Sequence, residues 1–273
     1  MMASNSMTMK SLFQGVDYRV ARTRGELEKA YRLVYQEYLK QGYVNEHPSR
    51  MRFSLHNALP EAATFLALVD DFVTATATVI PDSPLGLPMD ELYHRELDEL
   101  RLGNKKICEV SMLANTSELF GDHVPLMLNA KKMFLVFFLF KHIFDYVRME
   151  QGSDYICITV NPKHANTYDS LFFQDLGGLK QYHKVNGAPA VAKYLDVRAV
   201  QDRCSSSGRQ GLYKLFLSGQ ADPEKFKNRV RLLPEDIRFF FVDQVNLFKD
   251  ALPAHVEYIK ACYAQYDFST IIS

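Results

Sequence analysis

The succession of secondary structure is clearest in residues 153–196, which read SDYICITVNPKHANTYDSLFFQDLGGLKQYHKVNGAPAVAKYLD. An apolar, β-branched run predicts a strand, and the Asn-Pro pair after it predicts a turn into a short helix. A Gly-Gly pair then predicts a stop before two further strands. The predicted order is strand, helix, strand, strand, at 155–160, around His164 and Tyr168, at 179–185 and at 188–196.

Upstream residues extend this order toward the N-terminus. Thr23 and Glu26 have the spacing of a helix-capping box, and apolar residues recur at helical spacing from there almost to Gly42. Asp70-Asp71 separates two β-rich runs and predicts a hairpin. A proline-bearing stretch from 81 to 106 predicts a long excursion. The elements predicted here are strands at 16–21, 63–69, 72–80 and 107–113 and helices at 24–42 and 122–150.

Over residues 15–197 the order β-α-β-β-β-α-β-α-β-β resembles the GNAT acyltransferase fold, an α/β (α+β) fold with a mixed central sheet flanked by helices. Tyr168-Asp169-Ser170-Leu171 falls where that fold usually reads Tyr-Glu-Lys-Leu. The resemblance implies an acyl-transfer cleft between two neighbouring strands that splay apart, 107–113 and 155–160. Full pairing of these strands, or their placement in separate sheets, would exclude this interpretation.

The character of the chain changes after residue 196. Residues 201–211, QDRCSSSGRQG, are polar and rich in turn formers, which is typical of a boundary. Three helices are predicted beyond it, each with proline in its first turn, where the missing N–H costs nothing. They open at Asp222, Pro234 and Pro253. We therefore predict a GNAT-like acyltransferase domain at 1–198 and a helical C-terminal extension at 199–273 packed on it.

Composition and charge disfavour several classes of protein. Lysine plus arginine equal aspartate plus glutamate at 32 each, so nothing global favours nucleic acid. The most apolar segment, 133–140, is far shorter than the ~20 residues that cross a bilayer, and the N-terminus lacks a signal-peptide core. The four cysteines are widely spaced, so we expect neither a metal site nor a disulfide. We expect a cytoplasmic protein without a stable membrane span.

Three segments narrow the resemblance to the autoinducer-synthase branch of the fold: RLVYQEYLKQGYV (32–44), TVIPDSPLGLP (78–88) and CEVSMLA (108–114). In that branch a strand motif Glu-x-Ser-Arg follows a long excursion. Glu109 and Ser111 are kept here, but Met112 replaces the arginine. Thr78 and Val79 stand where a second arginine is usual. Both departures disfavour S-adenosylmethionine as the acceptor.

The tail from Tyr182 to Val191 resembles the long-chain N-acyl amino acid synthases. These enzymes transfer a fatty acyl group from acyl carrier protein to the amine of an amino acid, so the resemblance implies that reaction, that partner and no further cofactor. Coenzyme A is the less expected donor, because the loop LANTSELFGDHVPL (113–126) has one glycine, followed by an aspartate that repels phosphate. An acyl-homoserine-lactone-like autoinducer synthase and a non-catalytic acyl-binding module are the alternatives.

Three residues are candidates for catalysis. Glu109, in the strand beside the cleft, could accept a proton from the acceptor amine, or be a solvated glutamate on a half-exposed strand. His164 could shuttle a proton or bind the substrate carboxylate, although a histidine at a helix start is often a cap. Tyr168 matches the tyrosine that serves this fold as general acid for the leaving thiolate; helix packing is its alternative.

Substrate binding is predicted around the same cleft. By analogy with the fold, a bulge near Leu113 and Ala114 would free a backbone N–H for the thioester oxygen. Arg32 matches a family arginine and could hold the acceptor carboxylate, or be a solvated charge. Tyr43 would close over the acyl chain. The remaining candidates are Phe134 and Phe138 on the apolar face of the helix at 122–150, Ser111 in the strand motif, and Tyr35 on the apolar stripe of the first helix.

Two of these predictions have a plain structural alternative. The stripe tyrosines Tyr31, Tyr35 and Tyr38 could belong to the core, as could the phenylalanines of the apolar face. A docking surface for an acidic carrier protein needs lysine and arginine near the cleft, although such clusters are usually just soluble surface. Its candidates are Arg50, Arg52, Lys105, Lys106, Lys131 and Lys132.

Overall fold

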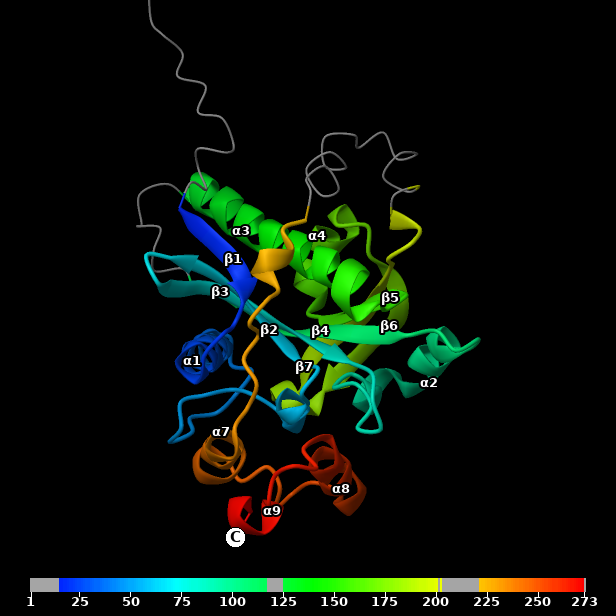
Figure 1. Cartoon of the computed structure of the whole chain (residues 1–273). Coiled ribbons are helices and arrows are strands. Elements are labelled where there is room, and N and C mark those ends of the chain that lie inside the picture. Colours follow the sequence, from blue (N-terminus) through cyan, green and yellow to red (C-terminus); the bar gives the residue numbers. More distant parts are fainter. Residues whose placement is uncertain (1–14, 117–124, 201, 203–220, 273) are drawn as a thin grey trace, which may run out of the picture.

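The structure is a computed structural model that describes residues 15–116, 125–200, 202 and 221–272, with the backbone alone for 125–133. At its centre is a seven-stranded mixed sheet with the strand order β1-β2-β3-β4-β5-β7-β6 (Figure 1). Neighbouring strands are antiparallel except for the parallel pair β4 and β5. The strands are β1 Val16–Val20, β2 Ala63–Val69, β3 Phe72–Pro81, β4 Ile107–Asn115, β5 Tyr155–Val160, β6 Gln174–Tyr182 and β7 Ala188–Asp196.

The predicted strand–helix order is confirmed, and local sequence explains two of its junctions. Asp70 and Asp71 both have positive φ angles, 47° and 65°, as the tight turn between β2 and β3 requires. Helix α1, Arg24–Lys40, begins after Thr23, whose side chain accepts a hydrogen bond from the Glu26 N–H. This N-cap satisfies one of the free donors in the first turn of the helix.

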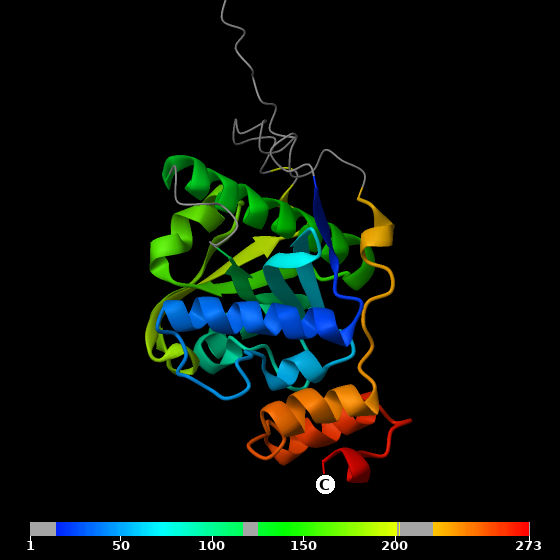
Figure 2. The same cartoon turned by 90° about the vertical axis from the view of Figure 1, so that its left-hand side faces the viewer.

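Helices cover both faces of the sheet (Figures 1 and 2). Phe65 of β2 belongs to the core cluster that contains α3, whereas the next residue, Leu66, belongs to the cluster that contains α1. Successive strand residues point to opposite faces, so α1 and α3 lie on opposite sides. The remaining elements between β1 and β7 are η2 Leu55–Ala58, α2 Asp90–Arg101, α3 Pro125–Tyr146, the π-helical turn η4 Val147–Gln151, η5 Pro162–His164, α4 Ala165–Ser170 and η6 His183–Val185.

Two predictions within this region were wrong in detail. The excursion at 81–106 contains a helix, α2, whose Tyr93 hydroxyl donates to the carbonyl oxygens of Gly178 and Ala190. The Gly-Gly pair does not stop a segment but lies inside β6. A Cβ atom on Gly177 would come within 2.5 Å of the Tyr93 ring, so glycine is needed there because the strand passes directly beside α2.

The C-terminal segment packs on the α1 side of the sheet (Figure 2). Phe240 is fully buried and meets Tyr31 of α1 edge to face, with ring centroids 5.4 Å apart. Tyr263 donates a hydrogen bond of 2.8 Å to the Ala58 carbonyl oxygen of η2. The first of the three predicted helices is only a 3-10 turn; the elements are η7 Pro223–Lys225, α7 Pro234–Arg238, the π-helical turn η8 Phe239–Gln244, α8 Pro253–Cys262 and α9 Phe268–Ile271.

Candidate active site

The sheet opens between β4 and β5. Their parallel pairing runs from Ile107 and Tyr155 to Glu109 and Cys157 and ends there, although both strands continue. The two strands therefore splay apart as predicted. A β-bulge accompanies the opening: Thr78 and Thr76 of β3 pair with residues 111 and 114 of β4, leaving two residues opposite one. Bulges bend a strand and strengthen its twist, which turns β4 away from β5.

The bulge lies at Met112 and Leu113, one residue before the predicted position. Met112 adopts a positive φ of 56°, which a residue other than glycine seldom does. Such a conformation costs of order 1–3 kcal/mol and persists only where the surrounding structure enforces it. Here Met112 is buried against Leu33 and Val34 of α1, so helix packing holds the strained backbone in place.

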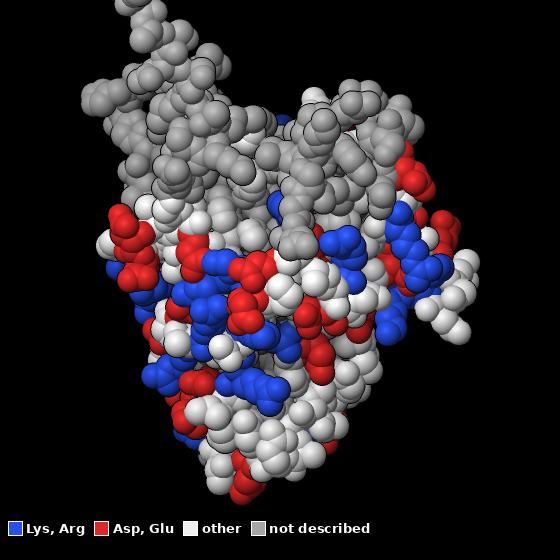
Figure 3. All heavy atoms as spheres, turned by 45° about the horizontal axis from the view of Figure 1, so that its top comes forward, with Lys and Arg blue, Asp and Glu red and all other residues white. Residues whose placement is uncertain are grey.

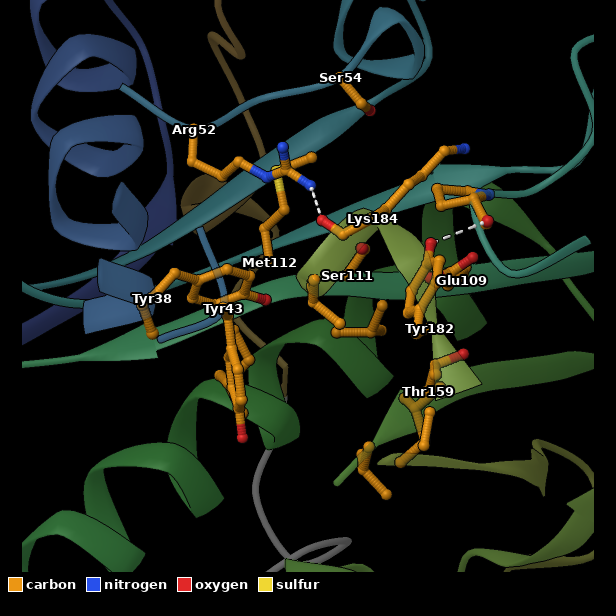
Figure 4. Close-up of a pocket in the computed structure, with 18 of the residues that line it drawn as sticks. Tyr38, Tyr43, Arg52, Ser54, Glu109, Ser111, Met112, Thr159, Tyr182 and Lys184 are labelled. Carbon is orange, nitrogen blue, oxygen red and sulfur yellow. Dashed lines mark hydrogen bonds between the residues drawn. The ribbon is translucent and has the colours of Figure 1, made fainter. Parts of the chain in front are cut away.

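A cavity of about 1200 Å³ fills the opening. The end between β4, β5 and α3 is apolar, and is lined by Leu113, Ala114, Val136, Phe140, Ile158 and Val160. The other end is polar, and is lined by Tyr38, Tyr43, Arg52, Ser54, His56, Glu109, Ser111, Tyr182 and Lys184 (Figure 4). The cavity is thus one continuous space with two parts. We call the apolar end the apolar arm and the polar end the polar chamber.

Glu109 lies where β4 and β5 part, and only 2% of its surface is exposed. One carboxyl oxygen accepts a 2.8 Å hydrogen bond from the Met89 N–H. Burial raises the pKa of Glu109 to about 8, although the hydrogen bonds from Met89 and Ser111 oppose this shift. The carboxyl group is therefore close to half-ionised near neutral to mildly alkaline pH, which suits a group that exchanges protons with an amine.

Arg52, Tyr182 and Lys184 line the cavity together with Glu109 (Figure 4). The Arg52 guanidinium donates a 2.9 Å hydrogen bond to the Lys184 carbonyl oxygen, and Lys184 pairs with Glu91 at 2.7 Å. Tyr182 donates to the Pro88 carbonyl oxygen at 3.1 Å. Among the described residues, Arg52 forms no salt bridge with a carboxylate. Its remaining N–H donors are therefore available to an anionic ligand in the chamber.

Two cavity-lining hydroxyl groups are buried without a hydrogen-bond partner in the described part of the chain. They belong to Tyr43, just after α1, and Thr159 of β5. Buried polar atoms in native proteins are nearly always hydrogen-bonded. A bound substrate with carbonyl or amide groups would satisfy both.

Tyr168 and His164 reach the cavity from the segment after β5. Tyr168 is buried, with its ring 5.7 Å from that of Phe140, and burial raises the pKa of its hydroxyl. It therefore remains protonated and able to donate. His164 is exposed on the whole, but desolvation of its imidazole by neighbouring atoms and the nearby Lys163 lower its pKa, which favours the neutral ring.

The structure brings seven of the predicted site residues to the cavity and leaves four outside. Those that line it are Tyr43, Glu109, Ser111, Leu113, Ala114, His164 and Tyr168. Arg32, Tyr35, Phe134 and Phe138 do not line it. Arg32 is exposed and donates to the Ser49 carbonyl oxygen at 3.4 Å, and the Tyr35 hydroxyl accepts from the His47 N–H at 2.9 Å. Phe138 instead packs against Tyr18, on another side of α3.

Sequence reasoning also missed parts of the wall. Tyr38 lines the cavity, whereas its neighbours on the stripe, Tyr31 and Tyr35, are core residues. Arg52, predicted for docking, lies in the chamber, and Lys105 pairs with Asp154 at 3.6 Å. Arg50 and Lys106 are exposed, and the side chains of Lys131 and Lys132 are outside the described ones.

The described residues contain neither a candidate membrane span nor a candidate metal cluster. None of their helices combines the length and apolar character that a bilayer crossing demands. Their histidine, cysteine and acidic side chains form no group of three that could hold a metal ion.

A mixed sheet whose central parallel strands part above a buried carboxylate defines an acyltransferase of the GNAT type. The family model described as N-acyl amino acid synthase FeeM matches residues 29–196. The structure of FeeM, an N-acyl amino acid synthase from uncultured soil microbes, is 31% identical, has a TM-score of 0.57 and covers 68% of this chain and 93% of its own. The chain belongs to the N-acyl amino acid synthase family and is an amide-forming acyltransferase.

Two more distant structures show the same fold. The AHL synthase LasI is 13% identical, with a TM-score of 0.50 over 70% of this chain and 94% of its own. TofI, solved with an inhibitor and MTA, is 10% identical, with a TM-score of 0.50 over 67% and 91%. The search of curated proteins gave no match.

Proposed function

We propose that this enzyme transfers a medium- or long-chain fatty acyl group from the thioester of acyl carrier protein to the α-amine of an amino acid. The observation that carries the proposal is the position of Glu109, which is buried where β4 and β5 part and lines the cavity. A fatty chain suits the apolar arm, because each buried methylene contributes about 0.8 kcal/mol. A zwitterionic acceptor suits the chamber.

The residues of the chamber support a direct transfer. The ionised Glu109 takes a proton from the acceptor's ammonium group, and the freed nitrogen attacks the thioester carbonyl carbon. The C–N bond forms first and gives a tetrahedral intermediate, and its collapse breaks the C–S bond. The Tyr168 hydroxyl gives its proton to the departing thiolate and regains one from the nitrogen, which loses its second proton as the amide forms. Main-chain N–H groups at the bulge around Leu113 stabilise the negative oxygen of the intermediate.

Arg52 replaces Arg32 as our candidate for the acceptor carboxylate. It lines the same cavity as Glu109, and its guanidinium has donors to spare. A planar guanidinium can hold a carboxylate with two parallel hydrogen bonds. An amino acid bound this way would present its amine toward the buried carboxyl group.

The choice of acyl carrier protein rests on the loop 113–126, which has one glycine and an aspartate where coenzyme A binding needs free N–H groups. A direct assay tests both substrates. The purified enzyme is incubated with the proteinogenic amino acids and a dodecanoyl thioester of either acyl carrier protein or coenzyme A. The products are identified by mass spectrometry. We expect N-acyl amino acids, formed at least tenfold faster from the protein thioester.

Glu109→Gln is the matched variant for this assay. It keeps the shape of the side chain and removes the base. We therefore expect amide formation to slow by about a hundredfold or more, while binding of the acyl donor stays intact. Unchanged turnover would remove Glu109 from the mechanism. The absence of any acylated amino acid with the unmodified enzyme would refute the proposed function.

A further inference from the structure

The C-terminal segment supplies part of the cavity wall. Leu247, Asp250, Ala251 and His255, in the loop before α8 and its first turn, line the same cavity as Glu109. These residues lie outside the range 29–196 that the family model matches. The family model therefore does not describe this part of the cavity wall.

This wall faces the polar chamber rather than the apolar arm. His56 of η2 lines the chamber, and its pKa is lowered to about 4 by burial first and then by Lys184, with a contribution from His255. Lys184 and Asp90 also act on Glu109. Leu247 of the wall packs on the same core cluster as Leu55 and Leu85, next to His56, so the C-terminal wall borders the same cavity as Glu109 on the side of η2.

The wall is firmly attached. The segment holding it shares a core cluster with α1 and η2, including the fully buried Phe240 and Ile259. Tyr263 is hydrogen-bonded to η2, and the ion pair between Arg24 and Asp236 at 3.4 Å adds a link to α1. Because α1 and η2 also border the cavity, packing on both of them holds the C-terminal wall in place relative to the rest of the cavity lining.

We propose that Leu247, Asp250, Ala251 and His255 form the far side of a subsite for the acceptor's side chain and select amino acids with apolar or aromatic side chains. The inference rests on the proposed function. An α-amino acid with its amine at Glu109 and its carboxylate at Arg52 must send its side chain away from both and away from the acyl arm. On the side of the wall the cavity lining includes the apolar Leu85, Leu247 and Ala251; Leu85 and Leu247 share one core cluster, and His56 lies beside Leu85. Asp250 and His255 add polar groups to the same wall.

Ala251→Phe in the full-length protein tests this assignment by filling the subsite. The kcat/KM values are measured for glycine, alanine, leucine and phenylalanine with one acyl donor. We expect a loss of about tenfold or more for the two large acceptors, and less than about twofold for the two small ones, because only large side chains need the space. Acyl-chain preference should not change.

Ala254→Phe is the matched control, because Ala254 lies three residues further on in the first turn of α8, is exposed and does not line the cavity. It should leave all four values unchanged. Leu247→Ala enlarges the subsite and should shift preference toward the largest side chains, which keeps the test decisive if Ala251→Phe does not fold. Equal losses for all four acceptors, or none, together with no shift in Leu247→Ala, would overturn the inference. Failure of the unmodified enzyme to acylate any amino acid would refute the proposed function instead.

Discussion

Glu109 shows how a single residue can be unfavourable for the fold and useful for the reaction. Its carboxyl group is withdrawn from water and has one main-chain donor, so the neutral form is favoured. A glutamate in water has already lost its proton at neutral pH and is a weak base. The elevated pKa brings the group close to the pKa of the amine that it must deprotonate.

This elevation has a consequence for stability that can be measured. The folded-state pKa of Glu109, about 8, lies above its ordinary value of 4.5, so the folded protein binds the extra proton. Its contribution to stability is complete below pH 4.5 and is lost as pH rises through 8. Relative to Glu109→Gln, the unmodified protein should therefore lose up to about 1.4 kcal/mol per pH unit in this window. Urea unfolding of both proteins at several pH values checks this; parallel curves would contradict it.

Sequence reasoning found some residues of the site and missed others for identifiable reasons. Glu109 and Tyr168 occur in motifs whose positions on a strand and a helix are fixed by the fold, so they could be placed. Arg52 lies in the irregular segment before η2, where no periodicity indicates a direction. The apolar run at 133–140 has no polar side, so periodicity could not show that Val136 and Phe140, rather than Phe138, face the cavity.

At the scale of elements, the loop between β3 and α2 holds the donor for Glu109. Asp90 accepts from the Leu87 N–H at 2.6 Å and from Arg101 at 2.6 Å, while Arg101 also binds Asp82 at 2.7 Å. This network fixes the turn that precedes the Met89 N–H. The prolines of 81–106 predicted a long excursion here, but only the structure shows that ion pairs and α2 order it.

Gly86→Ala should disturb that loop specifically. Gly86 has a φ of 68°, and an added Cβ would lie 2.9 Å from an Asp90 carboxyl oxygen. Gly103→Ala is the control, because its φ is 70° but nothing lies within 4 Å of an added Cβ. Both variants should lose about 1 kcal/mol of unfolding free energy from backbone strain. Only Gly86→Ala should also lower kcat/KM, by about tenfold, and move the acidic limb of its pH profile to higher pH, because loss of the Met89 N–H donor raises the pKa of Glu109 further. Equal rates for both variants would contradict this.

At the scale of the whole molecule, the sheet with α1 and the C-terminal segment share one hydrophobic core. The cluster that contains α1 is completed by C-terminal aromatic residues, and the predicted extension thus packs on the sheet domain as a wall rather than as an appendage. The division into two domains remains a prediction. On the face shown in Figure 3, acidic and basic side chains are interspersed, in keeping with the balanced overall charge.

Phe240→Ala should show how much the shared core contributes. The ring is fully buried against Phe53 and Tyr31, so its removal should cost about 3–5 kcal/mol of unfolding free energy. Phe72→Ala removes the same group from a site that is 70% exposed and should cost far less. Urea unfolding followed by circular dichroism measures both values. Comparable losses would mean that the C-terminal cluster is not part of the cooperative core.

The parting of β4 and β5 also bears on how this protein avoids aggregation. Past Glu109 each strand presents one unpaired edge, while β3 and β7 pair with the other edges. Unpaired edges on the outside of a sheet invite strands from other molecules. Here they face each other across an internal space bordered by α3 and α4, so main-chain donors and acceptors are offered to a small ligand and withheld from neighbouring copies.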